Sequence, residues 1–225
     1  MKKFKNVISI IFVALMLSVC IFMVGCGGPE TSNTELNSSA GSDTAEDTTT
    51  ANEPATNSIS QNAVIAVIDV KDYGKITVAL DPDSAPITVD NFVKLVKDGF
   101  YDGLTFHRIM EGFMMQGGDP EGTGMGGSEK TIKGEFSQNG VQNNLSHTRG
   151  AISMARSMDP DSASSQFFIV HKDSQFLDGQ YACFGYVTEG IEVVDKVCKD
   201  AKPTDDNGTI PKENQPVINS IKIVE

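Results

Sequence analysis

The chain has 225 residues, a formal net charge of -12 and only three histidines. Its excess of acidic residues argues against a surface for duplex nucleic acid, because such surfaces neutralise phosphates with Lys and Arg. The histidines lie far apart without a second ligand at metal-binding spacing, which argues against a zinc site.

The N-terminus has the composition of an export signal. Residues 1–6 contain three lysines and no acid, and residues 7–25 are all apolar, small or Ser. This pattern is typical of a signal peptide. The apolar run is also close to the roughly 20 residues that cross a bilayer, so an uncleaved transmembrane anchor stays open as an alternative.

Cys26 ends this run in the sequence Phe-Met-Val-Gly-Cys-Gly-Gly. The segment resembles a bacterial lipoprotein signal, in which a small residue precedes the cysteine that is acylated. We therefore expect residues 1–26 to be a lipoprotein signal, with Cys26 lipidated and the protein held extracytoplasmically at the cell membrane. Two or more acyl chains suffice for stable anchoring. Cys20 follows the bulky Val19 and suits such a site less well.

Residues 27–62 differ from the rest of the chain in composition. They contain six carboxylates, no Lys or Arg and no aromatic residue. Such a segment has too little apolar surface to order itself. We expect a disordered tether over 27–62, followed by one folded domain over 63–225.

The domain is rich in strand signals and poor in helix signals. Apolar alternation or short apolar runs predict strands at 63–70, 75–80, 151–155, 166–170, 181–187 and 217–224. Helices are predicted from Thr88, as N-cap, to Asp98 and from Ile191 to Cys198. Short strands with two helices favour a mainly β, antiparallel barrel or sandwich whose ends the helices plug.

Two cysteines fall within the domain, and an exported protein could join them. Cys183 lies in an apolar run and Cys198 closes an amphipathic segment. Spacing does not establish a disulfide. The apolar settings favour two buried free thiols.

Residues 122–127 read Gly-Thr-Gly-Met-Gly-Gly and satisfy a dinucleotide-binding pattern. No apolar strand precedes the motif and no helical pattern follows it, so nucleotide binding is disfavoured. A glycine-rich surface loop that passes close to a ligand or another chain fits better. Ser164 and Ser165 lack the glycine pattern of a hydrolase nucleophile.

Arg108 stands in Thr-Phe-His-Arg-Ile-Met-Glu-Gly-Phe-Met-Met-Gln, among aromatic residues and methionines. A guanidinium keeps its charge and is seldom buried without a partner. An arginine in such apolar surroundings therefore indicates a functional role.

Seven stretches of the domain, taken together and in order, resemble the cyclophilin family of peptidyl-prolyl cis/trans isomerases. They are Phe106-His-Arg-Ile, Gly112-Phe-Met-Met-Gln-Gly-Gly-Asp, Gly122-Thr-Gly, Ile152-Ser-Met-Ala, Ser165-Gln-Phe-Phe-Ile, Leu177-Asp-Gly and Phe184-Gly. The resemblance extends over essentially all of residues 63–225. It implies an eight-stranded antiparallel β-barrel capped by two α-helices.

The same resemblance implies the roles of individual residues. Arg108 would be catalytic, assisted by Phe113 and Gln116. The substrate would be bound by Met114, Gly122, Ala155, Arg156, Gln166, Phe168, Phe176, Leu177 and Tyr181. The family needs no cofactor, acts on proline-containing polypeptides and is expected to be monomeric.

Three positions depart from the commonest eukaryotic form. Phe176 stands where tryptophan is usual, Tyr181 where histidine is usual and Arg156 where asparagine is usual. Phe176 keeps an apolar wall but lacks the indole N–H, which predicts weakened cyclosporin binding more than lost catalysis. At Arg156 the family uses the main chain, so a changed substrate preference is expected.

The leading hypothesis is therefore a lipid-anchored, extracytoplasmic prolyl isomerase that helps exported proteins fold. A chaperone or proline-peptide binding module with little turnover is the main alternative. A structural domain would show neither catalysis nor peptide affinity.

Overall fold

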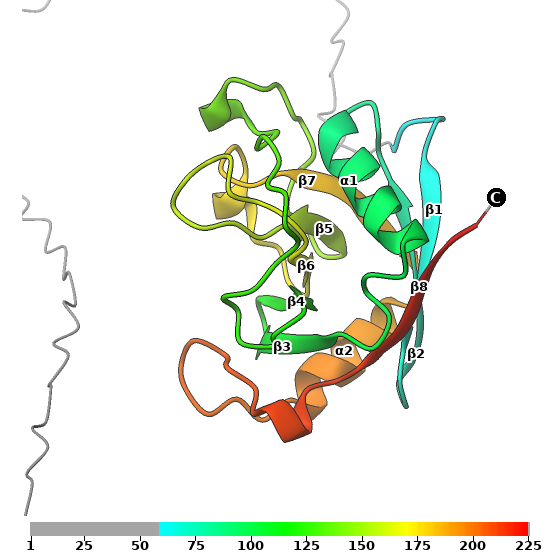
Figure 1. Ribbon diagram of the computed structural model, residues 1–225, viewed down its shortest axis with the longest axis vertical. Coiled ribbons are helices and arrows are strands. Elements are labelled where there is room, and N and C mark those ends of the chain that lie inside the picture. The colour runs from blue at the N-terminus through cyan, green and yellow to red at the C-terminus, as the bar shows by residue number, and fades with distance from the viewer. Residues whose placement is uncertain (1–58, 225) are drawn as a thin grey trace, which may run out of the picture. The chain divides into compact units, whose positions relative to one another are not determined.

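The computed structural model describes residues 59–224 (Figure 1). The expected signal segment with Cys26, and the tether up to residue 58, lie outside the described residues. Within 59–224, no helix combines the length and apolarity needed to cross a bilayer.

The described part of the chain forms one eight-stranded antiparallel sheet with two α-helices and three short 3-10 helices. The strands are β1 (Val64–Val70), β2 (Gly74–Leu80), β3 (Thr105–Met110), β4 (Met114–Asp119), β5 (Ala151–Met154), β6 (Phe167–Val170), β7 (Cys183–Glu189) and β8 (Ile218–Val224). The helices are α1 (Pro86–Lys97), α2 (Ile191–Asp200), η1 (Ser137–Asn139), η2 (Gln175–Leu177) and η3 (Lys212–Asn214). The expected mainly β, antiparallel fold with two helices is confirmed.

The sheet has the order β3-β4-β6-β5-β7-β2-β1-β8 and curls into a barrel-like shape. Its first and last strands approach each other: the Phe106 N–H donates to Pro216 O at 2.9 Å, and the Ile218 N–H donates to Leu104 O at 2.8 Å. Figure 1 shows α1 and α2 at opposite ends of the curled sheet. The long connections that follow β4 and β5 lie on the side away from β1, β2 and β8.

Four aromatic side chains pack together where α1 contacts the sheet. Phe92 of α1 meets the ring of Phe167 edge-on with centroids 5.5 Å apart, and Tyr101 and Phe184 lie 5.1 and 5.3 Å from it. All four side chains are fully buried. Because successive side chains of a strand point to opposite faces, Phe167 enters this core while Phe168 joins a second cluster with Met114 and Leu177.

The N-cap of helix α1 lies three residues earlier than predicted, and Thr88 is not the cap. Ala85 occupies the cap position without a side-chain hydrogen bond, and Pro86 opens the first turn. The helix is capped from a distant loop, because the buried Glu135 carboxylate accepts the N–H groups of Ile87 and Thr88 at 3.0 and 2.7 Å. The prediction failed since this cap comes from 47 residues away in sequence.

Residues 59–62, which the sequence places in the tether, contact the domain in the structure. Ile59 packs against the second apolar cluster, and the side chains of Ser60 and Asn62 hydrogen-bond to Asp83. The packed region therefore includes Ile59, Ser60 and Asn62.

The two domain cysteines are free and buried, as predicted. Cys183 lies on β7 and Cys198 on α2. Burial raises the pKa of each thiol to about 12, so both stay protonated and unreactive near neutral pH.

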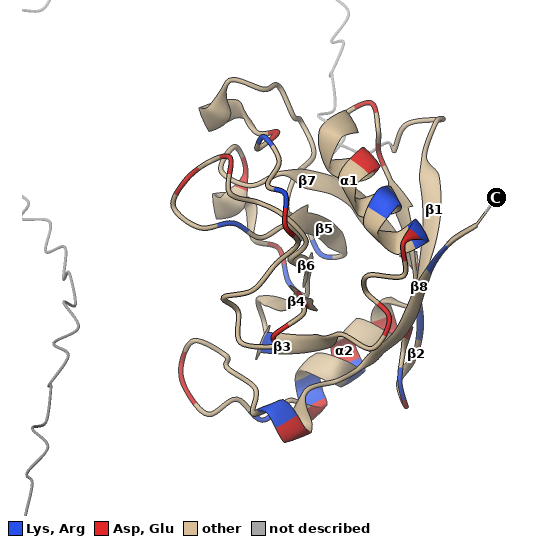
Figure 2. Cartoon of the chain, in the orientation of Figure 1, with Lys and Arg blue, Asp and Glu red and all other residues tan. Residues whose placement is uncertain are grey.

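Charged residues are spread over the outer elements. Figure 2 shows acidic and basic residues interspersed on α1, α2 and the loops, without a single large basic face in this view. This distribution is typical of a solvated surface.

Candidate active site

Arg108 lies on β3, directly across from Gln116 on β4. Its Nε donates to Asn207 O at 2.7 Å, and its Nη1 donates to Gln116 Oε1 at 3.2 Å. The remaining contacts are to thioether sulfurs, Met110 Sδ at 3.3 Å and Met114 Sδ at 3.9 Å. Since thioether sulfur is a weak acceptor, N–H groups of the guanidinium remain available to a ligand.

Arg108 is a cation without a carboxylate partner. Among residues 59–224, none of the ion pairs within 4.0 Å involves it. Burial lowers the pKa of Arg108, while the charges of Tyr181 and Asp205 raise it. Arginine starts so far above neutrality that the side chain stays charged at physiological pH.

A cavity of about 120 Å³ lies beside this guanidinium. Its lining comprises Arg108, Phe113, Met114, Gln116, Ala155, Arg156, Phe168, Leu177 and Tyr181. All nine are site residues predicted from the sequence. The Phe113 ring centroid lies 6.0 Å from Arg108 Cζ, and the Phe168 and Tyr181 rings meet edge-on at 6.0 Å. The arrangement offers a small, ring-sized space walled mainly by apolar side chains, with the two arginines Arg108 and Arg156 in its lining.

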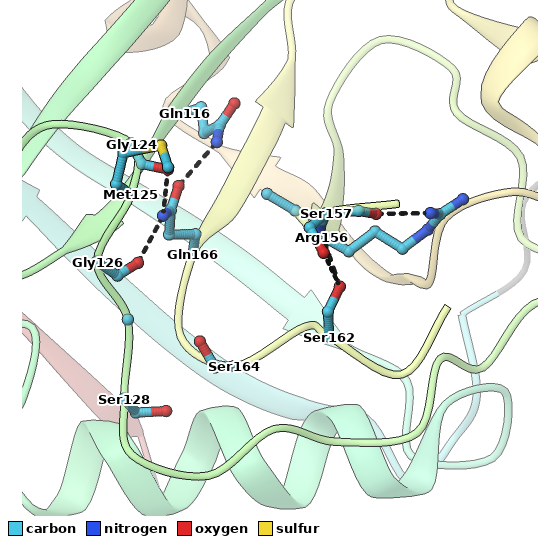
Figure 3. A pocket seen from close by; sticks show the side chains of 12 residues that line it. Gln116, Gly124, Met125, Gly126, Ser128, Arg156, Ser157, Ser162, Ser164 and Gln166 are labelled. Atoms are coloured by element: carbon cyan, nitrogen blue, oxygen red, sulfur yellow. Dashed lines mark hydrogen bonds between the residues drawn. The ribbon is translucent and has the colours of Figure 1, made fainter. Parts of the chain in front are cut away.

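A larger cavity of about 500 Å³ adjoins the first (Figure 3). Gln116, Ala155 and Arg156 line both cavities. The other lining residues are Gly124, Met125, Gly126, Gly127, Ser128, Ser157, Ser162, Ser164 and Gln166. Because these three residues line both cavities, a ring and its neighbouring groups could be held side by side.

Gln166 connects Gln116, which lines both cavities, to the glycine loop through hydrogen bonds. Its Oε1 accepts from Gln116 Nε2 at 2.9 Å, and its Nε2 donates to Gly126 O at 2.7 Å and Gly124 O at 3.1 Å (Figure 3). Gln116 in turn accepts from Arg108. This chain of bonds fixes the orientation of the guanidinium relative to the glycine loop.

Arg156 is held where the cavities meet. Its guanidinium lies over the rings of Phe136 and Tyr181, 5.0 and 4.7 Å from their centroids. Nε and Nη2 both donate to Gln180 O, at 3.0 and 2.8 Å. The side chain is thus a rigid part of the wall.

Two predicted site residues lie outside both cavity linings. Gly122 has a φ of +66° and is held in a turn, where its carbonyl accepts from Gln215 at 2.9 Å. Phe176 is 67% exposed and stacks on Phe113 with centroids 5.7 Å apart. It extends the apolar surface at the rim without closing the small cavity.

The lining serines and Gly124, Gly126 and Gly127 were not predicted as site residues. Only the glycine-rich motif gave a signal, as a loop passing close to a ligand. The fold places it here because the Asp119 carboxylate accepts backbone N–H groups of Glu121, Thr123 and Gly124 at 2.6 to 2.9 Å. These bonds hold the pKa of Asp119 below its usual value despite the opposing effect of burial.

His147 supports the small cavity from behind. Its ring lies parallel to Phe168 at 6.0 Å, with Nδ1 2.7 Å from Asp178 Oδ1 and Nε2 3.0 Å from Ser153 Oγ. The side chain is buried and does not line either cavity. A structural role fits this position.

His107 is buried between Arg108 and the glycine loop. Both of its ring nitrogens are buried and form no hydrogen bond with a described residue. Burial lowers the pKa of His107, although Asp119 and Gln166 lie near enough to favour protonation. The folded protein therefore keeps this ring neutral at pH values where an unfolded chain would protonate it.

We expect His107 to make stability fall on the acid side of neutrality. The stability that the neutral ring contributes is fully present above the ordinary histidine pKa of about 6.5. It is lost as the pH falls below this value, because the unfolded chain then binds the extra proton. Replacing it by leucine, His107→Leu, should flatten the loss between roughly pH 6.5 and 5. The urea midpoints of both proteins, measured across this pH range, report the loss of stability. Identical pH slopes in the two proteins would show that His107 does not cause it.

Comparisons with known proteins identify the family. The family model described as cyclophilin-type peptidyl-prolyl cis-trans isomerase matches residues 64–224. Peptidyl-prolyl cis-trans isomerase B of Bacillus subtilis is 50% identical over 123 residues, which cover 55% of this chain and 82% of the relative. Peptidyl-prolyl cis-trans isomerase A of Dickeya dadantii is 44% identical over 161 residues, covering 68% and 80%.

A solved structure shows the same fold. The cyclophilin-type isomerase of Cryptosporidium parvum, crystallised in the presence of the dipeptide Ala-Pro, superposes with a TM-score of 0.63 and 29% identity. The similarity covers 72% of this chain and 99% of that one.

Proposed function

The chain belongs to the cyclophilin-type family and is a peptidyl-prolyl cis-trans isomerase, and we propose that Arg108 and the small apolar cavity catalyse rotation about X-Pro bonds in exported proteins. The observation that carries the mechanism is a guanidinium with available N–H groups at the edge of a ring-sized apolar cavity.

The chemistry requires no nucleophile. An X-Pro bond resists rotation because the nitrogen lone pair is delocalised into the carbonyl, with a barrier of about 18–20 kcal/mol. No covalent bond breaks during isomerisation. Any group that favours a pyramidal nitrogen with a localised lone pair lowers the barrier.

Arg108 meets this requirement by donating an N–H to the proline nitrogen as the amide twists. Phe113, Met114, Phe168 and Leu177 clamp the proline ring while the carbonyl side turns. The apolar wall also keeps water away, so the fixed charge acts strongly. A millionfold acceleration requires about 8 kcal/mol, which such preorganisation and orientation can supply.

The larger cavity holds the substrate residues that flank the proline. Gln116 and Gln166 present amide groups there, and the backbone at Ala155 and Arg156 runs along the boundary with the small cavity. An extended peptide can pair with these groups while its proline stays in the apolar space. In this arrangement the larger cavity binds the substrate peptide, and the small cavity holds the proline at which catalysis occurs.

Proline-limited refolding of a substrate protein tests the function. The full-length chain should accelerate the slow phase catalytically, at concentrations far below that of the refolding protein. A binding module with little turnover would instead slow or arrest refolding and act only near stoichiometric amounts. That outcome would favour the alternative of a chaperone.

The proposed substrates are exported proteins, and the support is the sequence of residues 1–26. Acylation at Cys26 would place the domain on the outer side of the membrane, with residues 27–58 as a tether. Replacing the acceptor, Cys26→Ser, should release the processed protein from the membrane fraction. If it stays membrane-bound after signal processing, the lipid anchor is wrong; a retained signal segment would indicate the transmembrane alternative.

A further inference from the structure

His171 fastens the β3–β4 turn to the end of β6. It directly follows Val170, the last residue of β6, and its backbone N–H donates to Phe113 O at 2.8 Å. Its ring nitrogen Nδ1 accepts the Gly112 N–H at 2.8 Å. One residue therefore holds the turn at two successive positions.

The Gly112 N–H that bonds to His171 lies at the centre of a tight turn. Residues 110–113 form a four-residue turn closed by the Phe113 N–H on Met110 O at 3.0 Å. Gly112, at its third position, has a φ of +80°, as in a type II turn. The Gly112 N–H belongs to the central peptide and has no role in closing the turn. Its acceptor on His171 thus fixes the orientation of that peptide.

The same bond fixes the protonation of His171. A backbone N–H can only donate, so Nδ1 must carry a lone pair and the ring proton must lie on Nε2. Nε2 faces Asp195 Oδ1 at 3.2 Å. Asp195 is held by a two-point ion pair with Arg149 at 2.7 and 2.8 Å. The Arg149 pairing keeps the pKa of Asp195 below its usual value, so the carboxylate remains an acceptor.

The position of this turn affects the small cavity through Phe113. That side chain lines the cavity, lies beside Arg108 and stacks on Phe176. A change in the Gly112 peptide would redirect Phe113 and open one wall. His171 itself lines neither cavity.

We propose that His171 is a positioning residue for isomerisation, whose neutral ring, protonated on Nε2, locks the turn that carries Phe113 against the proline. The inference rests on the proposed function of the small cavity. Since it concerns the wall that holds the ring, its loss should weaken substrate binding more than turnover.

Three variants of the full-length chain test the proposal at one position. In His171→Asn, Oδ1 stands where Nδ1 stood and can still accept the Gly112 N–H. In His171→Gln the acceptor moves away from this place, and His171→Leu has none. We expect KM to rise about five- to tenfold for the Leu and Gln variants with kcat within twofold, and the Asn variant to stay within twofold of wild type in both. Urea unfolding of each variant shows that it is folded.

A spectroscopic measurement supplies an independent readout. Long-range nitrogen-proton NMR of the wild-type ring should show the proton on Nε2 near neutral pH. A proton on Nδ1, or folded Leu and Gln variants with wild-type KM, would overturn the proposal. If the wild-type chain itself lacked isomerase activity, the proposed function would fail. Peptide dissociation constants would then test His171, with the same order among the variants.

Discussion

Replacing the arginine by alanine, Arg108→Ala, should lower kcat/KM by roughly a hundred- to a thousandfold. Removing one preorganised donor from a site that stabilises developing charge costs about 2.7–4 kcal/mol in the transition state. Stability should change little, because the guanidinium is only partly buried and bonds to a loop carbonyl, an amide and two thioethers. A coupled or NMR isomerisation assay on a short X-Pro peptide measures the loss.

The matched variant for this prediction is Arg108→Lys. Lysine keeps a positive charge but lacks the planar guanidinium. Only the guanidinium can bond to Asn207 and Gln116 and at the same time present an N–H to the ligand. We expect the lysine variant to recover less than a tenth of wild-type activity. Full activity in the alanine variant would show that the cation does not act on the twisted amide.

Replacing the buried cap of α1, Glu135→Ala, should lower the free energy of unfolding by about 2–4 kcal/mol. Glu135 is 2% exposed and accepts both the N–H and the hydroxyl of Thr88 at 2.7 Å, as well as the Ile87 N–H. Alanine would leave these donors buried without partners, at roughly 1–3 kcal/mol each before relaxation, and would remove a negative charge from the helix N-terminus.

Urea unfolding measures this effect, and Glu129→Ala is the control. Glu129 is an exposed acid a few residues away along the same segment. Its removal should change stability by no more than about 0.5 kcal/mol. Equal midpoints for both variants would contradict the role of Glu135 as the cap of α1.

Because Phe136 follows Glu135 and supports Arg156, a folded Glu135→Ala protein should also bind peptide more weakly.

The sequence pattern predicted six of the eight strands but not β3, which carries Arg108, or its neighbour β4. β4 contains Gly117 and Gly118, which weaken a strand signal. Both glycines are required by contacts that appear only in the fold: a Cβ on Gly117 would lie 2.8 Å from Thr105 O, and one on Gly118 2.6 Å from Ser165 O. The eight-strand expectation came from the family resemblance instead.

Seven of the nine residues that line the small cavity fall in the motifs that carry the family resemblance, and the same resemblance supplied Arg156 and Tyr181. Other contacts join residues that are far apart in the sequence. The Gly122 carbonyl accepts a hydrogen bond from Gln215, 93 residues away, and the Thr88 N–H donates to Glu135. The sequence gives no sign of a role for His171 in the site, since its partners Gly112 and Asp195 lie in other elements. A single sequence gives no signal for such pairings.

Cis–trans exchange of one X-Pro peptide, followed by NMR with the full-length chain and with Arg108→Ala, tests the central claim most directly. The same titration reports both binding and exchange. We predict rapid exchange with wild type and, for the variant, comparable peptide binding with exchange at least a hundredfold slower. A folded wild-type chain that binds the peptide without accelerating exchange, or a variant that exchanges it as fast, would contradict catalysis by Arg108.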